Sequence, residues 1–460
     1  NKKFAKPACF ICYTVKGFGL PLAGHKDNHA GIMSKEQFTV YQNSMNIRAG
    51  KEWDKTEGVK VPTKAFKEHL FKNIFYNIDK DRNFSDQYIE FTEKKITFKN
   101  YISTQDAFGQ ILNEIGKDKD SASRRIITTS PDVTVSTNLG SWVNQRNIFS
   151  RNTKIDIFKE KKVTSAQKWK YSPHGQHIEL GIAENNLFLL LGALGISEKI
   201  FGTRLLPIGT IYDTFIGRGL DALNYATYID ARFILVGTPS GITLSHEGGA
   251  HQSIITPNIG IAQPNLNYYE PTFVDELKVL IFWALNNIQK KNGKSVYLRL
   301  STKKLTQPNR SLSNSIKDDI IKGGYWLQNN EKKLDLIIIC TGVIAGEVIN
   351  CLNLIKDEEL NIGIFIATSP DALYEDWITS TKKSNYKSHL EKKLFNVNTK
   401  TPIITIIDGH SSALSWIGSI KGQKIIPLGV NKFGQSGDLK EVYQFNEIDL
   451  NSIVDRIARF

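Results

Sequence analysis

The sequence predicts an α/β protein in which helices flank parallel sheets, and two observations support this fold class. Short apolar runs typical of buried strands alternate with helical patterns between residues 100 and 305. The same alternation resumes after a polar stretch at 305–333, which indicates a second unit of the same class. Such alternation is typical of parallel sheets that carry helices on both faces.

In the first unit, β-branched runs such as "RRIITTS" indicate strands, and apolar residues at helical spacing indicate helices. The segment 178–195 is almost wholly apolar after Glu184. We therefore expect a helix buried on every side, with the carboxyl group neutral or bound to a partner. Strands are predicted at 124–130, 204–210, 231–241 and 295–302, and helices at 178–195, 214–228 and 272–291.

The second unit repeats the pattern three times, and the first hundred residues follow a different one. "CFICYTVKGFG" (9–19) is expected to be a buried strand, and 51–100 reads as helices plus a linker. In the second unit the strands are predicted in "LDLIIICTG", "NIGIFIATSP" and "PIITIIDGH", and the helices in "AGEVINCLNLI", "DALYEDWITS" and "SALSWIGSI".

Composition excludes several classes of protein. The 460 residues are 40% hydrophobic and 23% charged, as in an ordinary globular protein of two or three domains. No apolar run approaches the roughly 20 residues that span a membrane. Four cysteines do not make a disulfide framework. Cys9 and Cys12 form a lone C-x-x-C, which we interpret as two small residues of a buried strand, not a metal or redox site. A reducing cytoplasm fits this cysteine usage.

The net charge of +13 raises the question of a polyanionic partner. The lysines are scattered, however, and no basic stripe is interleaved with aromatic residues as single-strand binding favours. We therefore expect a solvated basic surface and no nucleic acid. A mild attraction for an acidic partner protein stays open.

Candidate site residues follow the predicted strands, where ligands bind in such sheets. Asp132 follows the strand at 124–130, and Tyr212 and Phe215 follow the strand at 204–210. Glu247 and His251 follow the strand at 231–241. Each has a structural alternative, since a lone aspartate often caps a turn and a lone phenylalanine often belongs to the core.

Taken together, the motifs resemble the transketolase-like thiamine diphosphate enzymes, most closely the homodimeric type of pyruvate dehydrogenase. The resemblance covers essentially the whole chain. It implies a thiamine diphosphate-binding fold with parallel sheets flanked by helices, followed by a transketolase C-terminal-like α/β domain. Its densest stretches are "TVKGFGLPLAGHKDNHAG" (14–31), "GQHIELGIAENN" (175–186), "LLPIGTIYDTFIGRGLDAL" (205–223) and "VGTPSGITLSHEGGAHQS" (236–253).

The resemblance implies a division of the chain into three parts. Residues 1–95 would be the end of a diphosphate-binding domain and a linker, 96–310 a pyrimidine-binding domain, and 311–460 the C-terminal domain. The family's Gly-Asp-Gly motif, with its magnesium-binding asparagine, is absent from the sequence. We expect these magnesium ligands upstream of residue 1, so no metal ligand is assigned in this chain.

The resemblance also implies roles for the residues that would face the cofactor. Glu184 would hydrogen-bond N1′ of the cofactor's aminopyrimidine ring and so help to remove the C2 proton of the thiazolium ring. Phe215 would stack on the pyrimidine with Tyr212 beside it. Asp132 would lie near the reactive end of the cofactor.

Other roles concern the substrate side. His251 and Glu247 would face the substrate, with His251 stabilising an oxyanion or transferring a proton. His25 and His29 match the paired histidines near the diphosphate and the substrate mouth. Their i, i+4 spacing leaves a metal pair as the alternative. Arg299 stands where transketolases carry an arginine for the substrate phosphate.

These expectations define a function. The chain would decarboxylate pyruvate and transfer the acetyl group to a lipoyl-bearing dihydrolipoyl acetyltransferase, linking glycolysis to acetyl-CoA. It would act as a homodimer in the cytoplasm, with the cofactor between subunits. The "EGGAH" loop is one residue shorter than expected for a transketolase, which favours the pyruvate branch. The alternatives are a transketolase that moves two-carbon ketol units between sugar phosphates, and a non-catalytic interaction fragment.

Overall fold

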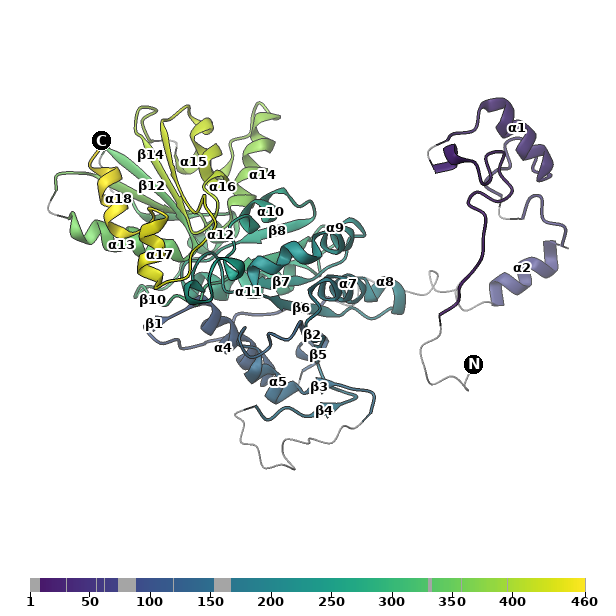
Figure 1. Cartoon of the computed structure of the whole chain (residues 1–460), viewed down its shortest axis with the longest axis horizontal. Helices are drawn as coiled ribbons and strands as arrows, with labels where there is room; N and C mark the ends of the chain where they lie inside the picture. The colour runs from purple at the N-terminus through teal and green to yellow at the C-terminus, as the bar shows by residue number, and fades with distance from the viewer. Residues whose placement is uncertain are drawn as a thin grey trace. The chain divides into compact units, whose positions relative to one another are not determined.

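The chain forms two compact units, Asn1–Asn83 and Phe84–Phe460 (Figure 1). The computed structural model describes residues 9–29, 31–54, 56–61, 63–72, 88–118, 120–152, 167–329, 333–356, 358–394 and 396–459.

The described residues of the N-terminal unit form short helices joined by irregular segments. It contains the 3-10 turn η1 (Lys26–His29) and the helices α1 (Lys35–Ser44) and α2 (Thr63–Lys72). The strand predicted at 9–19 is wrong: the segment is irregular with turns, and Phe10, Cys9 and Cys12 are exposed. A strand needs a neighbour for its backbone groups, and the described part of this unit offers none.

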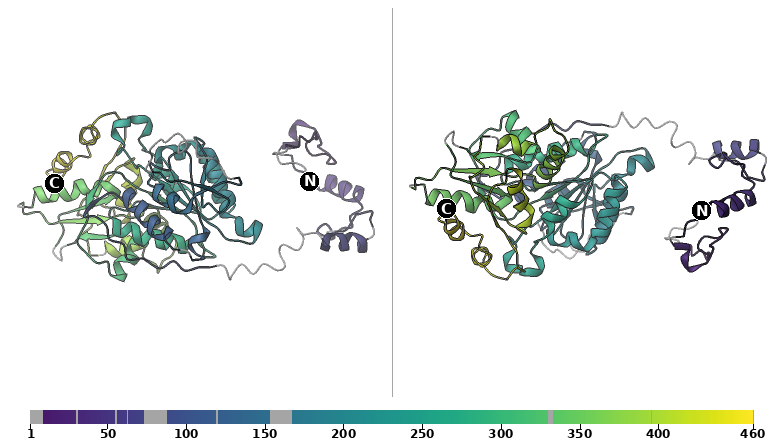
Figure 2. Two further views of the ribbon diagram at one scale, coloured as in Figure 1. Left: turned by 90° about the horizontal axis from the view of Figure 1, so that it is seen from below. Right: turned by 90° about the horizontal axis from the view of Figure 1, so that it is seen from above.

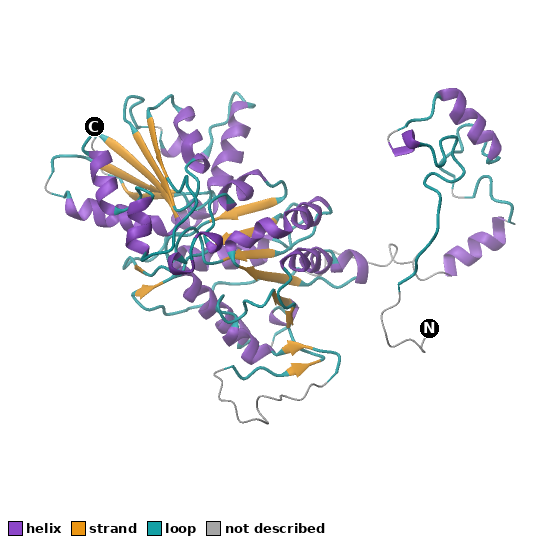
Figure 3. Cartoon of the chain, viewed as in Figure 1, coloured by secondary structure: helices purple, strands orange, loops and turns teal. Residues whose placement is uncertain are grey.

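The larger unit is built on two sheets, drawn as orange arrows in Figure 3. In the described residues, eight strands form the first sheet, and every pair of neighbours is parallel. From edge to edge the strands are β4 (Tyr171–Ser172), β3 (Ile148–Phe149), β5 (His177–Glu179), β2 (Ile126–Ser130), β6 (Leu206–Ile211), β7 (Ile234–Gly237), β9 (Ser295–Arg299) and β8 (Leu266–Tyr269).

Helices cover both faces of this sheet because its strands are apolar on both sides. In β7, Ile234 and Val236 pack with α4 (Thr104–Gly116) and α11 (Val274–Asn287), whereas Leu235 packs with α7 (Glu184–Gly195) and α9 (Leu220–Tyr228). The connecting elements are η3 (Ser123–Arg125), α5 (Gly140–Arg146), α8 (Ser197–Phe201), η4 (Asp213–Gly219), η5 (Ser245–Glu247), η6 (Gly249–His251) and α10 (Thr256–Ala262).

The second sheet is mixed, with an antiparallel edge strand. Its order among the described strands is β11 (Tyr325–Gln328), β13 (Ile362–Ile366), β12 (Leu336–Thr341), β14 (Ile403–Ile407) and β15 (Ile425–Leu428), and only the β11–β13 pair is antiparallel. In β12, Ile338 packs toward α13 (Ala345–Leu354) and α18 (Leu450–Ile457). Ile339 packs toward α14 (Pro370–Thr381) and α16 (Ser412–Ser415) on the opposite face (Figures 1 and 2).

The remaining elements join these layers. A two-stranded antiparallel ribbon pairs β1 with β10 across 200 residues of sequence, and so ties the beginning of the unit to the end of its first sheet. The elements are β1 (Tyr101–Ile102), β10 (Leu305–Thr306), α12 (Asn314–Ile321), η7 (Gly342–Ile344), α15 (His389–Lys393), η8 (Trp416–Ile420) and α17 (Leu439–Phe445).

The predicted fold class is confirmed, with corrections to individual elements. The helix expected at 178–195 begins at Glu184, and β5 takes in the first two residues of the expected range. The helix expected at 214–228 is divided into η4 and α9. The polar stretch 305–333 contains β10, α12 and β11. None of the helices in the described part of the chain has the length and apolar character needed to cross a membrane.

Candidate active site

A pocket of about 290 Å³ lies at the carboxyl ends of β2 and β6, where ligands bind in sheets of this kind. It brings together five side chains that the sequence analysis selected from four separate segments. Apolar residues before α7, at the end of β6 and after β2 complete its wall. The lining residues are Pro131, Asp132, Val133, Ile182, Glu184, Ile211, Tyr212, Phe215, Arg218 and His251.

Glu184 is the first residue of α7, and its side chain is only 12% exposed. Its position places the carboxylate at the positive end of the helix dipole, where negative charge is favoured. The expectation that α7 is buried all round is wrong: Leu187 and Phe188 are buried, but Leu189 is 55% exposed. The expectation of a partner for Glu184 is met by Arg218, whose Nη1 donates to its Oε1.

Arg218 was missed from the sequence, although it makes two contacts in the pocket. Its guanidinium carbon lies 3.6 Å from the centroid of the Phe215 ring, in addition to the ion pair with Glu184. Side chains at i and i+3 eclipse one another in a 3-10 helix, and η4 has this geometry. The i, i+3 spacing of Phe215 and Arg218 was visible, but the sequence predicted an ordinary helix there.

Aromatic rings surround His251 on one side of the pocket. The Tyr212 and Phe215 rings stack with centroids 6.0 Å apart, and His251 meets Phe215 edge-on at 5.5 Å. The Nε2 atom of His251 lies 3.7 Å from Oε2 of Glu247. Its Nδ1 atom is buried and has no hydrogen-bond partner in the described structure. A buried polar atom of this kind is costly, so Nδ1 is a natural contact point for a ligand.

The Asp132 loop is anchored by Glu179, a residue that the sequence analysis did not select. Asp132 has a φ of +64°, and its backbone N–H donates to Oε1 of Glu179 at 2.9 Å. Thr134 Oγ1 donates to the other oxygen at 2.6 Å, and His177 lies beside it. Burial alone would raise the pKa of Glu179, but the hydrogen bonds from His177, Thr134 and Asp132 hold it below its usual value.

Arg299 is not in the pocket but in a fully buried network behind it. Its Nε donates to Asp213 at 2.9 Å, its Nη1 to Glu270 at 2.7 Å, and its Nη2 to the backbone oxygen of Asp408 at 2.8 Å. Burial raises the pKa of Glu270 despite the opposing effect of Arg299. The guanidinium is satisfied inside the protein, so none of it is available to a substrate phosphate in this structure.

His25 and His29 belong to the N-terminal unit, where both are exposed. Nδ1 of His29 lies 2.8 Å from the Lys16 amino group, and Nδ1 of His25 lies 3.5 Å from an Asp27 oxygen. An ammonium group beside one of the two rings does not favour a metal pair. In the part of the chain that the structure describes, no group of three or more potential metal-binding side chains comes together.

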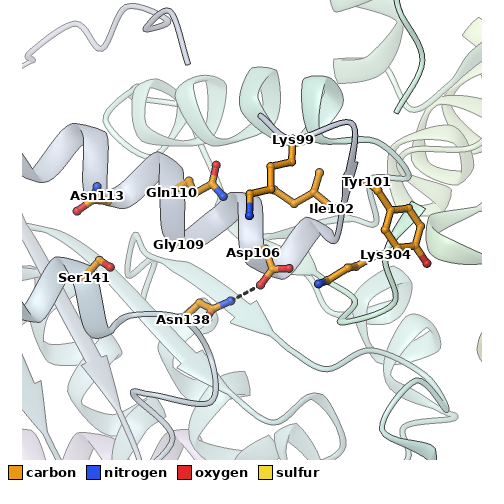
Figure 4. Close-up of a pocket in the computed structure, with 10 residues that line it drawn as sticks. All are labelled: Lys99, Tyr101, Ile102, Asp106, Gly109, Gln110, Asn113, Asn138, Ser141 and Lys304. Atoms are coloured by element: carbon orange, nitrogen blue, oxygen red, sulfur yellow. Dashed lines mark hydrogen bonds between the residues drawn. The ribbon is translucent and has the colours of Figure 1, made fainter. Parts of the chain in front are cut away.

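A second cavity, of about 380 Å³, lies along α4 and beside α5 (Figure 4). Asn138 donates to Asp106 at 2.9 Å within it, and Lys99 and Lys304 also line it. None of the nine predicted site residues borders this cavity. Its size alone does not indicate chemistry, so we place the candidate site in the smaller pocket.

Apart from Arg218, which contacts both Glu184 and Phe215 in this structure, the residues of the smaller pocket fit the aminopyrimidine half of thiamine diphosphate. Glu184 offers a mostly buried carboxylate for a ring nitrogen, and Phe215 offers an aromatic face to a flat heterocycle. The unpartnered Nδ1 of His251 provides a polar contact on the facing side. A parallel sheet with this pocket at its carboxyl edge, joined to a mixed second sheet, defines an α/β protein with a candidate ligand site at the sheet edge.

Comparison with known proteins agrees with this class. The sequence model of the pyruvate dehydrogenase E1 component middle domain matches residues 84–306, and that of the transketolase-like C-terminal domain matches 323–449. These matches together take in most of the chain. The chain belongs to the transketolase-like family, which includes transketolases and pyruvate dehydrogenase E1 components.

Individual relatives are distant and of both kinds. The pyruvate dehydrogenase E1 component of Pseudomonas aeruginosa is 24% identical over 370 residues, which are 77% of this chain and 41% of the relative. A transketolase of Scheffersomyces stipitis is 24% identical over 285 residues, 62% of this chain and 38% of the relative. The crystal structure of Campylobacter jejuni transketolase has a TM-score of 0.65 at 16% identity, covering 96% of this chain and 62% of that one. The chain thus spans about two fifths of the length of these curated relatives.

Proposed function

We propose that this chain binds thiamine diphosphate through the Glu184 pocket and decarboxylates pyruvate, passing the acetyl group to a lipoyl group on a partner acyltransferase. The observation that supports this most is the grouping of Glu184, Phe215 and His251 around one small pocket at the carboxyl edge of a parallel sheet. A binding module has no use for a sequestered carboxyl group that faces an aromatic platform.

The residues of the pocket have separate tasks in this proposal. Thiamine diphosphate supplies, when bound, a carbon nucleophile and an electron sink for decarboxylation. Glu184 holds a proton at the pyrimidine nitrogen, and Phe215 orients the ring by stacking. His251, with Glu247 beside it, holds or moves a proton at the substrate oxygen. The apolar wall excludes water and strengthens these polar contacts.

The charges that the pocket offers support pyruvate as the substrate. A sugar phosphate needs cationic groups that are free to bind it, and Arg299 is buried among Asp213 and Glu270. Arg218 is the one arginine that lines the described pocket, and it pairs with Glu184. The match to a pyruvate dehydrogenase E1 middle domain over 84–306 supports the same choice. Magnesium and a lipoyl-bearing partner are part of the proposal.

We also propose that a second copy of the chain covers the face formed by α7, α8 and α9. Large apolar side chains are exposed there, although such patches are uncommon on monomers. Ile182 belongs both to this face and to the wall of the pocket, so a second copy would close the site. The exposed residues of the face are Ile182, Leu189, Phe201, Tyr225 and Tyr228.

A substrate comparison tests the proposal. With thiamine diphosphate and magnesium present, the protein is assayed for pyruvate decarboxylation with an artificial electron acceptor, and for ketol transfer from xylulose 5-phosphate to ribose 5-phosphate. We expect the pyruvate reaction to be faster, with acetylation of added lipoyl domains. Faster ketol transfer would assign the chain to the transketolases. Cofactor binding without either reaction would favour a non-catalytic role.

A further inference from the structure

The loop that carries Glu247 and His251 is held from two sides. At its base, the Ser253 N–H donates to the Gly241 oxygen at 2.9 Å, which closes the loop on the first sheet. In its two short 3-10 turns, η5 and η6, Ser245 alone is buried, and the His251 side chain is 34% exposed. Such turns have few internal contacts, so other parts of the protein must determine where His251 stands.

The contacts that hold the loop come from the chain between β15 and α17, beside the second sheet. The segment 434–437, which leads into α17, lies directly on the loop. The Gln252 side chain donates to the Gln435 oxygen at 2.9 Å, and Ser436 Oγ donates to the His246 oxygen at 3.0 Å. The Gly437 N–H donates to the Ser245 oxygen at 3.3 Å.

Two glycines allow the backbones to approach this closely. A Cβ atom on Gly249 would lie 2.5 Å from the Gly434 oxygen, and a Cβ atom on Gly434 would overlap the Gln252 side-chain oxygen. Any larger residue at Gly434 must therefore displace Gln252, the immediate neighbour of His251. The end of β14 adds a further anchor, since Asp408 Oδ1 accepts the Ile242 N–H at 3.0 Å.

We infer that Gly434 and the segment 434–437 are positioning residues for His251. The segment acts through Gln252 and the backbone of η5 and η6, and none of its residues lines the pocket. The segment thereby contributes to the active site indirectly, because it determines where His251 stands in the wall of the pocket. The functional consequence rests on the proposed function, whereas the positioning itself does not.

The environment of the His251 ring can be measured by NMR on the protein alone, without cofactor and without an activity assay. Histidine ring carbons are labelled with ¹³C, and the signal of His251 is assigned with the His251→Asn variant. In Gly434→Ala we expect this signal to move by more than its line width while that of His389, buried elsewhere, stays in place. The matched control is Gly437→Ala, which keeps the N–H that donates to Ser245 and whose Cβ meets its nearest neighbour at an ordinary 3.4 Å, so the His251 signal should stay unchanged.

Two further variants separate positioning from general damage. Gln252→Ala removes the side chain that the new methyl group strikes, so the double variant should show less than the sum of the two single shifts. If Gly434→Ala does not fold, Ser436→Ala removes the bond to His246 without adding atoms and should move the same signal. A folded Gly434→Ala or Ser436→Ala protein with an unmoved His251 signal would overturn the inference.

The reaction provides an independent measurement. We expect Gly434→Ala to lower kcat by about 10- to 100-fold, the loss typical of a displaced reacting group, while the dissociation constant of thiamine diphosphate stays the same. An unchanged kcat alongside a shifted His251 signal would contradict the functional part. Absence of cofactor binding in the unaltered protein would count against the proposed function and leave the His251 result standing.

Discussion

Arg218 occupies the two positions that we assign to the cofactor's pyrimidine ring. Its planar guanidinium lies on the face of Phe215 and donates to Glu184. A pyrimidine would need the same ring face and the same carboxylate. Arg218 must therefore leave these contacts when the cofactor enters, and the free energy of the contacts opposes binding.

Replacing Arg218 with Met should strengthen cofactor binding. The ion pair, in which Arg218 is half exposed, and the cation–π contact together contribute about 1 kcal/mol, which corresponds to a roughly fivefold lower dissociation constant. Calorimetric titration with thiamine diphosphate measures it. Arg124→Met, which removes the same charge from an exposed site outside the pocket, is the control. Weaker binding in Arg218→Met would show that the guanidinium assists the cofactor.

Single residues of the pocket were predictable only where a motif identified them. Glu184, Phe215 and His251 stand at the ends of recognisable strands and helices, and the sheet topology brings such ends together. The state of Arg299 could not be predicted, because its partners Asp213 and Glu270 are distant in sequence. The sequence shows that residue 299 is an arginine, but it does not show that the side chain is buried.

At the scale of elements, Asp371 links α14 to β8. The side chain is buried in the first turn of the helix and accepts the Tyr268 N–H at 3.1 Å. Burial, with a smaller contribution from Glu375, raises the pKa of Asp371 from 3.8 to about 7. The folded protein therefore holds this proton more tightly than the unfolded chain does.

This shift gives a pH dependence of stability with a definite sign. Stability from the protonated Asp371 is present below about pH 4 and is lost as the pH rises toward about 7. Asp371→Asn keeps an oxygen for Tyr268 without the charge, so we expect it to flatten this dependence and raise the free energy of unfolding at pH 8. Urea unfolding from pH 4 to 8 measures this, with the exposed Asp318→Asn as control. An unchanged slope in Asp371→Asn would contradict the assignment.

Elements were predictable where a strand had partners within the chain. The central strands β2, β7 and β9, and β12, β13 and β14 of the second sheet, lie within their predicted ranges, since their apolar runs are buried on both faces. Strand β6 extends one residue beyond its predicted range, and the edge strand β15 was not predicted. "CFICYTVKGFG" is similarly apolar, but no strand lies beside it among the described residues of the N-terminal unit, and it forms none. The antiparallel edge strand β11 was missed because its sequence, "YWLQ", stands in a polar stretch.

At the scale of the whole molecule, the exposed face of α7, α8 and α9 is the surface on which we propose that a second copy docks. Leu189 lies on this face with more than half of its side chain exposed, and α7 also carries Glu184. A second copy would bury these apolar groups and gain about 25 cal/mol for each Å² removed from water. The general class of the fold could be predicted from the sequence, but the position of this exposed apolar face could not. It depends on which side of α7 the rest of the chain leaves open.

Sedimentation velocity tests the assembly. We expect the protein to be a dimer at micromolar concentration and Leu189→Asp to shift it to monomer, since an aspartate in an apolar interface is costly. Leu354→Asp, on the exposed side of α13, should leave the dimer intact. A monomer in the unaltered protein, or a dimer that tolerates Leu189→Asp, would mean that another partner covers the face or that it stays open.

The central claim is that Glu184 exchanges a proton with the pyrimidine of thiamine diphosphate. The most direct measurement is hydrogen–deuterium exchange at C2 of the bound cofactor, in the unaltered protein and in Glu184→Gln. Glutamine keeps the size of the side chain but cannot share the proton, so we expect exchange to slow by about 100-fold or more. The control Asp221→Asn, exposed in the first turn of α9, should exchange normally. Normal exchange in folded, cofactor-bound Glu184→Gln would contradict the account.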